Sequence, residues 1–252
     1  EFGYQPTLRM TFPGPGASVK ENRNQSWAAT DWAASLDALQ ALCPNLESVA
    51  LIVVWFGDDL RAGHCTIAPR VDLHNKMMWF MLGAGDWSVA GLPRAAARLV
   101  SQVEGRAAYG GSPSDDSVVA AIRDLKARGL SVVLYPFVMM DIPADNALPD
   151  PWSDADSQPA YPWRGRISCD PAPGQPGSVD ATNIAATQIA TFFGSSAPGP
   201  AEWSYRRFVL HCAQLCVAAG GVDAFLVGSE LETVEHVALP MRAAAIVEWQ
   251  AL

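Results

Sequence analysis

The stretch Gly221-Val222-Asp223-Ala224-Phe225-Leu226-Val227-Gly228-Ser229-Glu230-Leu231 decides how this chain is expected to fold. A helical pattern runs into the glycines, an apolar strand follows, and a carboxylate stands where that strand ends. In parallel α/β architectures the C-terminal ends of the strands carry the chemistry. Glu230 is therefore a candidate general acid or base. The alternative is a capping role, since Ser229 and Glu232 have the spacing of a capping box at a helix start.

The same order of helix, glycine or proline, and strand recurs upstream. A helix over 31–42 precedes an apolar strand at 48–55. A second helix starts after Ser114, ends at Gly129 and precedes a strand at 130–139. Both strands are continuous apolar runs, which is typical of strands buried on both faces of a parallel sheet.

Two further helices, over 180–193 and 202–219, lead into the opening stretch, and a short strand is expected at 107–109. Counted along the chain, the strands at 48–55, 107–109, 130–139 and 222–227 become strands one to four. The pattern predicts an α/β fold of the (β/α)8-barrel kind, of which only the N-terminal half is apparent. Either the protein continues beyond Leu252 or the sheet is open, and we expect continuation.

Around this framework the chain is less regular. We expect a loop-like lead-in over 1–26 and the partial barrel over 27–252, with long strand-end insertions at 58–90 and 141–202. Smaller predicted elements are a hairpin formed by 66–71 and 77–82, a helix over 92–104 and a helix over 240–252.

Composition excludes several classes of partner. The 252 residues carry a net charge of −9 and are 50% hydrophobic, which argues against nucleic acid or an anionic membrane surface. No apolar stretch approaches the roughly 20 residues of a membrane-spanning helix. The first residues show no basic region followed by an apolar one, so no signal peptide is expected.

The possible metal ligands are scattered. Five cysteines and four histidines form no Cys-x-x-Cys pair and no second ligand pair beside His64 and Cys65. Cys212 and Cys216 lie one helical turn apart, a poor geometry for a disulfide. We expect neither a metal site nor another cofactor.

Three other stretches contain candidate site residues. Strand one ends in Trp55-Phe56-Gly57-Asp58-Asp59. These residues could give a sugar an aromatic stacking face with carboxylates beside it, or they could form an ordinary turn. In Tyr135-Pro136-Phe137 the proline should mark the point where strand pairing stops, which makes Tyr135 a site candidate. Trp163-Arg164-Gly165-Arg166 could bind a carboxylate, place an arginine against a sugar or a catalytic Glu, or simply pack an arginine on Trp.

Five motifs occur together in one order: Trp55-Phe56-Gly57-Asp58-Asp59-Leu60-Arg61, Tyr109-Gly110-Gly111-Ser112-Pro113-Ser114-Asp115, Tyr135-Pro136-Phe137-Val138-Met139-Met140-Asp141, Trp163-Arg164-Gly165-Arg166-Ile167 and Gly228-Ser229-Glu230-Leu231. From about Trp27 to Glu232 the chain resembles the TIM-barrel-like domain of gene transfer agent and phage-tail host-specificity (baseplate hub) proteins. That domain is in turn similar to clan A glycoside hydrolases, especially the β-mannanase-like families.

The resemblance implies that Glu230 is the catalytic acid/base of a retaining glycoside hydrolase. The expected substrate-binding residues are Trp55, Asp58, Asp59, Tyr109, Tyr135, Trp163, Arg164 and Ser229. Two departures stand out. Mannanase-like enzymes have Lys and His where this chain has Tyr135 and Phe137, and the nucleophile of the clan comes from a seventh strand that this chain does not reach.

Two functions follow from the resemblance. One is a glycoside hydrolase domain in a phage-tail-like particle, acting on cell-envelope polysaccharide or peptidoglycan glycan. The other is a non-catalytic structural or glycan-binding barrel of the tail baseplate. In both cases the expected partners are a cell-envelope glycan and other tail or baseplate proteins, and the particle component would be made in the bacterial cytoplasm.

Overall fold

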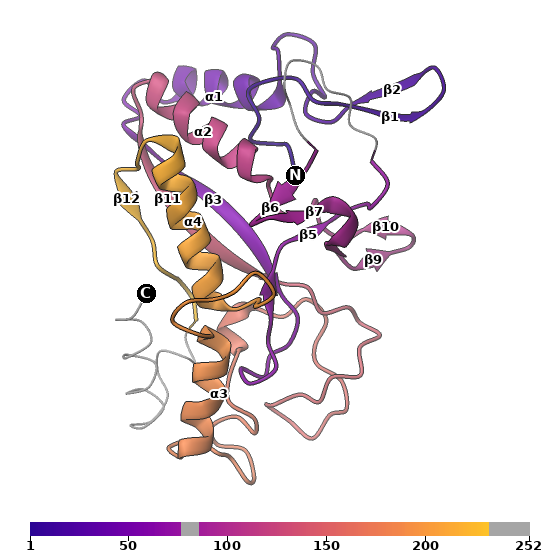
Figure 1. Cartoon of the computed structure of the whole chain (residues 1–252), viewed down its shortest axis with the longest axis vertical. Helices are drawn as coiled ribbons and strands as arrows, with labels where there is room; N and C mark the ends of the chain where they lie inside the picture. Colours follow the sequence, from indigo (N-terminus) through magenta and orange to yellow (C-terminus); the bar gives the residue numbers. More distant parts are fainter. Residues whose placement is uncertain (77–85, 232–252) are drawn as a thin grey trace.

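A four-stranded sheet with the order β12-β11-β3-β4 forms the centre of the computed structural model, which describes residues 1–76 and 86–231 (Figure 1). β3 (Ser48–Gly57) and β11 (Ser131–Met140) pair in parallel over ten residues, from Ser131↔Ser48 to Met140↔Gly57. β12 (Ala224–Phe225) adds a short parallel strand beside β11. At the opposite edge, β4 (Ile67–Ala68) is antiparallel to the end of β3.

Four helices accompany the sheet: α1 (Asp31–Leu42), α2 (Asp115–Ala127), α3 (Asn183–Phe193) and α4 (Tyr205–Ala219). Each begins at a side-chain cap, in order Thr30, Ser114, Thr182 and Ser204. Gly129 and Gly220 end α2 and α4 with positive φ, a conformation that glycine adopts without steric cost. These helices confirm the predictions made from capping and periodicity.

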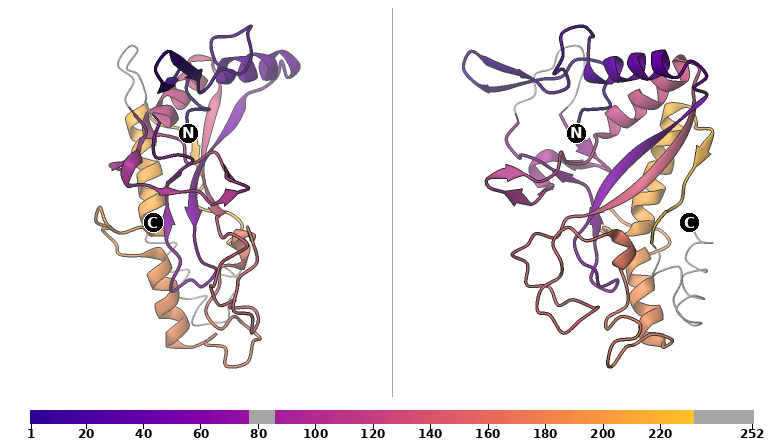
Figure 2. Two further views of the ribbon diagram at one scale, coloured as in Figure 1. Left: turned by 90° about the vertical axis from the view of Figure 1, so that its right-hand side faces the viewer. Right: turned by 180° about the vertical axis from the view of Figure 1, so that it is seen from behind.

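The two faces of the sheet differ. Leu51, Val53 and Trp55 of β3 are buried on the side where α2 and α4 pack, and so are Val132, Leu134 and Val138 of β11. On the other side Ile52 and Leu226 are exposed, and within the described residues no helix covers this face, which we call the open face (Figure 2, right). The prediction that both long strands are buried on both faces is therefore wrong for most of their length, and it holds at the end of β3, where Trp55 and Phe56 are both buried.

The predicted second strand is also wrong. Residues 106–107 form β10 (Arg106–Ala107), which pairs antiparallel with β9 (Gln102–Val103) in an exposed hairpin. Both strands of this hairpin are two residues long and exposed, unlike the buried strands of a parallel sheet. β3 therefore pairs directly with β11, and the described residues contain three consecutive parallel strands and no closed barrel.

Pro136 affects the sheet on one side only. Backbone hydrogen bonds from β12 reach the carbonyls of Val132 and Leu134 and go no further, whereas pairing with β3 continues to Met140. The backbone groups of even-numbered β11 residues thus face β12, so the missing N–H of Pro136 falls where β12 departs. The expectation that pairing stops at this proline holds for β12 and fails for β3.

The smaller elements differ from several predictions. The lead-in, expected to be loop-like, contains the hairpin of β1 (Met10–Gly14) and β2 (Ala17–Lys20), and the helix expected over 92–104 is absent. The remaining short elements are β5 (Arg70–Val71), β6 (Ser88–Val89), β7 (Leu92–Pro93), a 3-10 turn (Arg94–Ala96), β8 (Arg98–Leu99) and a second 3-10 turn (Arg164–Arg166).

β5 pairs in parallel with β8, and the hairpin predicted for 66–71 with 77–82 stays a prediction. The segment 77–82 lies outside the described residues, as do Glu232 and the helix expected over 240–252. The boundary proposed at residue 27 stays a prediction. Among the described helices, none combines the length and apolarity needed to cross a bilayer.

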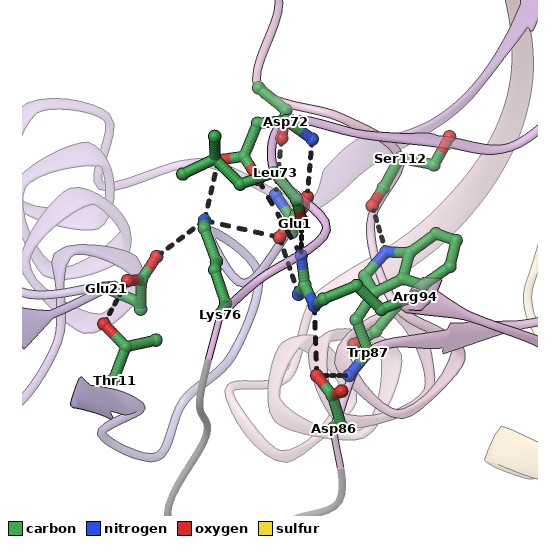
Figure 3. A network of polar contacts seen from close by, with 12 residues as sticks. Glu1, Thr11, Glu21, Asp72, Leu73, Lys76, Asp86, Trp87, Arg94 and Ser112 are labelled. Atoms are coloured by element: carbon green, nitrogen blue, oxygen red, sulfur yellow. Dashed lines mark hydrogen bonds and ion pairs between the residues drawn. The ribbon is translucent and has the colours of Figure 1, made fainter. Parts of the chain in front are cut away.

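A buried polar network holds the insertion after β3 against the first residue (Figure 3). The Glu1 carboxylate accepts hydrogen bonds from Arg94 Nη2 at 2.8 Å and from the Asp72 backbone N–H at 2.9 Å. Lys76 Nζ bridges Glu1 and Asp72, and Arg94 Nε also reaches Asp86 at 3.1 Å. Because both cations have carboxylate partners, their burial is compensated.

Replacing Leu134 by alanine tests the two-faced sheet. Leu134 is fully buried under the helices, so we expect Leu134→Ala to lower the free energy of unfolding by about 2–5 kcal/mol. The matched variant Val133→Ala, one residue away on the open face, should cost less than half of that value. Urea denaturation measures both, and equal losses would contradict the distinction between the faces.

Candidate functional site

Five of the nine predicted site residues meet over the open face of the sheet. Tyr135 lies on β11, Trp163 and Arg164 begin the 3-10 turn of the long insertion, and Ser229 and Glu230 follow β12. They are joined by hydrogen bonds that span up to 94 residues of sequence. We call these five residues the Glu230 cluster.

Arg164 is the centre of this cluster, and its side chain is only 5% exposed. Its Nε donates to the Ser229 carbonyl at 3.1 Å, and its Nη2 donates to Ser229 Oγ at 3.1 Å and Tyr135 Oη at 3.3 Å. The guanidinium also stacks on Phe137, with Cζ 3.7 Å from the ring centroid. The Phe137 ring supports the face of the guanidinium, whose N–H groups bond to oxygens of Ser229 and Tyr135. Because one of these oxygens is the Ser229 carbonyl, Arg164 fixes the backbone next to Glu230.

Glu230 is anchored through one carboxylate oxygen. Oε2 accepts a hydrogen bond from Trp163 Nε1 at 2.8 Å and lies 3.1 Å from Arg164 Nη2. Oε1 has no hydrogen-bond partner among the described residues, and the side chain is 54% exposed. One oxygen is thus oriented by the protein while the other has no described partner, beside the half-exposed indole of Trp163.

The backbone at Glu230 is left-handed, with φ +54°. This conformation costs a non-glycine residue about 1–2 kcal/mol. Two contacts support the strand end that carries it: Tyr205 Oη donates to the Val227 carbonyl at 2.7 Å, and the Ser229 and Tyr135 hydroxyls hydrogen-bond each other. The Ser229 hydroxyl is therefore engaged within the Glu230 cluster, and the helix that it would cap lies outside the described residues.

Trp55 does not belong to this site, and its prediction as a sugar platform is wrong. The side chain is fully buried on the helix-covered face, stacked on Phe208 with ring centroids 4.9 Å apart. Trp203 and His211 also contact it. Because strand residues alternate between faces, Trp55 points away from the face over which Tyr135 lies.

Asp58 and Asp59 hold loops together rather than facing the Glu230 cluster. Asp58 accepts hydrogen bonds from Thr66 Oγ1 at 2.6 Å and Arg98 Nη1 at 2.8 Å. Asp59 is buried and binds Arg61 through both carboxylate oxygens, with Gln158 Nε2 at 2.7 Å. Burial opposes ionisation of Asp59, but the hydrogen bonds from Arg61 and Gln158 outweigh it and lower its pKa.

Tyr109 lies at the C-terminal end of β11, where its hydroxyl donates to the Met140 carbonyl at 3.3 Å. Its ring packs between Phe56 and Tyr161, and burial raises the pKa of its hydroxyl. These contacts give Tyr109 a packing role at the strand end.

Sequence reasoning missed Phe137 as the support of Arg164, and it missed a second group formed by Asp115, Arg207 and His211. His211 Nε2 lies 2.7 Å from Asp115 Oδ1 across 96 residues of sequence, a separation that no local motif signals. In the part of the chain that the structure describes, no three His, Cys, Asp or Glu side chains are grouped to hold a metal ion.

Residues 203–251 match the family model described as the GTA TIM-barrel-like domain. The predicted resemblance to the gene transfer agent domain is confirmed. The matched segment contains α4, β12 and Glu230. No curated protein matches the chain. Similarity to clan A glycoside hydrolases stays a prediction.

Arg164→Lys tests the geometry of the cluster. A lysine ammonium cannot reproduce the planar set of bonds to Ser229 and Tyr135, so we expect a loss of about 2 kcal/mol in the free energy of unfolding. The control is Arg166→Lys in the same turn, where the side chain is 39% exposed and its ion pair with Asp150 is long at 3.8 Å, and where a change under about 0.5 kcal/mol is expected. Similar urea midpoints for the two variants would contradict the role given to Arg164.

The lowered pKa of Asp59 predicts how the stability of the fold should change in acid. Its folded-state pKa lies below the ordinary value of 3.8, so its stabilising contribution is present above pH 3.8 and is lost as the pH falls through the folded-state pKa. Asp59→Asn should therefore have a lower free energy of unfolding than the wild type at neutral pH. Below pH 3.8 its free energy of unfolding should change less with pH than that of the wild type. Asp154→Asn, at an exposed position of the long insertion, is the control. Parallel acid denaturation curves for wild type and Asp59→Asn would refute the assignment.

Proposed function

We propose that this chain is a component of a phage-tail-like gene transfer agent particle and that its Glu230 cluster cleaves a glycan of the cell envelope. The match of residues 203–251 to the GTA TIM-barrel-like domain supports the particle. Support for the glycan comes from the chemistry of the cluster, in which an aromatic face, a carboxylate and hydroxyl groups lie together at a strand end.

The arrangement of Glu230 carries this proposal. An acid/base catalyst needs a fixed orientation and one oxygen free to exchange a proton with the substrate. Glu230 combines an anchored Oε2 with an Oε1 that has no partner among the described residues. Trp163, whose N–H holds the carboxylate, is 47% exposed and can stack on a sugar ring beside it.

Arg164 acts on Glu230 rather than on the substrate in this proposal. Its Nε and Nη2 donors bond to Ser229, Tyr135 and Glu230, and the side chain is buried. It therefore orients the catalytic carboxylate and does not receive a substrate carboxylate. A retaining mechanism also needs a second carboxylate about 5 Å from the first, and the proposal places that nucleophile outside these 252 residues.

A second candidate is a glycan-binding surface without turnover, and the order of the strands favours it. In the clan A resemblance the acid/base follows the fourth barrel strand. In this chain Glu230 follows β12, the third of three consecutive parallel strands. The same aromatic and polar side chains would then bind a glycan and leave it intact.

Glu230→Gln separates these functions. With isolated cell-envelope glycan as substrate, we expect the wild-type protein, assayed in the assembled particle so that the nucleophile is present, to release reducing ends. Glu230→Gln should lose at least about 100-fold of that rate, the usual scale of general acid–base catalysis. The matched control is Glu104→Gln, an exposed glutamate of the β9–β10 hairpin, which should keep the wild-type rate.

Binding of the same glycan is measured in parallel by co-sedimentation. Binding without release in the wild type would overturn cleavage in favour of the second candidate. If the wild type neither binds nor releases, or if Trp163→Ala binds as well as the wild type, the Glu230 cluster is not a glycan site.

A further inference from the structure

A second cleft lies on the helix-covered side of the molecule, away from the open face. Its volume is about 580 Å³, and it is bordered by the start of α2, one side of α4, the turn of the β6–β7 hairpin and the loop before α4. Its polar lining residues are Asp115, Arg207, His211 and Gln214. The volume is typical of small-molecule sites, in which a few polar groups converge in a largely apolar cleft.

Arg207 is the distinctive group of this cleft, because it is a buried cation that forms no ion pair with the described carboxylates. It is 8% exposed and stacks on Trp203, with Cζ 3.7 Å from the ring centroid. Its Nη1 donates to the carbonyls of Pro200 and Glu202, both at 2.7 Å, and its Nη2 donates to the Ala90 carbonyl at 3.2 Å. No carboxylate lies within ion-pair distance of it in the described part of the chain.

Two N–H donors of Arg207 therefore have no acceptor among residues 1–76 and 86–231. Of the five donors of a guanidinium, Nη1 uses two and Nη2 uses one, which leaves Nε–H and one Nη2–H. Nε and Nη2 share one edge of the guanidinium, an edge that can bind a planar carboxylate through two parallel hydrogen bonds. A buried cation gains most from an anionic partner, since carbonyl dipoles compensate its charge only in part.

Asp115 does not compete for this edge. Its Oδ1 is engaged by His211 at 2.7 Å, its Oδ2 accepts from the Ala90 backbone N–H at 3.0 Å, and it lies in the first turn of α2. Helix N-termini stabilise negative charge, so the Asp115 carboxylate is satisfied within the fold. Gln214, two turns after Arg207 on α4, is exposed and adds an amide donor to the cleft wall.

We propose that this cleft binds a carboxylate-bearing small molecule, with the free edge of Arg207 on the carboxylate and Gln214 beside it. The site is separate from the Glu230 cluster and does not depend on the function proposed for that cluster. The bound carboxylate would form the direct ion pair that Arg207 does not make with any described residue.

Isothermal titration with sodium D-glucuronate tests this site, and D-glucose is the uncharged match that differs only at the carboxylate. We expect glucuronate to bind at least about tenfold more tightly than glucose, a difference equivalent to 1.4 kcal/mol. Glu230→Gln should bind glucuronate as the wild type does, so that failure of the glycan proposal leaves this result unaffected.

Two variants locate the binding. Arg207→Gln should abolish the preference for glucuronate, but Arg207 also bonds to three carbonyls, so this variant can lose stability. Gly199→Phe avoids that problem: Gly199 lines the cleft, has nothing within 4 Å of an added Cβ and has no left-handed φ. It should fill the cleft and weaken glucuronate binding about tenfold or more, whereas Gly14→Phe, equally open but in β1, should not.

Three results would overturn the proposal. They are equal affinity for glucuronate and glucose, unchanged glucuronate binding by Gly199→Phe, and displacement of glucuronate by an equal concentration of inorganic phosphate. The last result would assign the cleft to oxyanions in general rather than to carboxylates.

Discussion

The parallel pairing of β3 with β11 is the constraint on which the rest of this structure depends. Ten residues in unbroken register place Leu51 beside Leu134 on one face and Ile52 beside Tyr135 on the other. Because the register has a period of two, this pairing decides at once which side chains the helices bury and which are available on the open face. The Glu230 cluster lies on the open face because the odd-numbered β11 residues, Tyr135 and Phe137 among them, point to that face.

Local signals in the sequence were sufficient for much of the fold. Capping residues and glycines located the helices, and apolar runs located β3 and β11. Tyr135, Trp163, Arg164 and Glu230 are predicted because they stand at strand ends or in an aromatic-basic cluster, and Ser229 is predicted from the family resemblance. The structure brings all five together. That they act on a glycan stays a proposal.

The failures have a different physical origin, since they concern non-local pairing. Nothing near Trp55 shows which face of β3 will be covered, because Trp55 and its neighbour Phe56 are both apolar. The short strands between 88 and 107 span only two residues each, too few to show a periodicity, and one of them, β8, pairs with the distant β5. The contact between Arg207 and Ala90 spans 117 residues of sequence, so the second cleft could not be inferred from any motif.

The left-handed backbone at Glu230 sets stability against activity at one position. Glycine adopts this conformation without steric cost, so Glu230→Gly would relieve about 1–2 kcal/mol of backbone strain and would at the same time remove the carboxylate that Trp163 and Arg164 hold. The strain thus opposes the ion pair with Arg164 and the hydrogen bond from Trp163, and the side chain is retained at a backbone cost that glycine would not have. A screen for thermostable variants of this chain should therefore select for binding or turnover together with stability, so that Glu230 is kept.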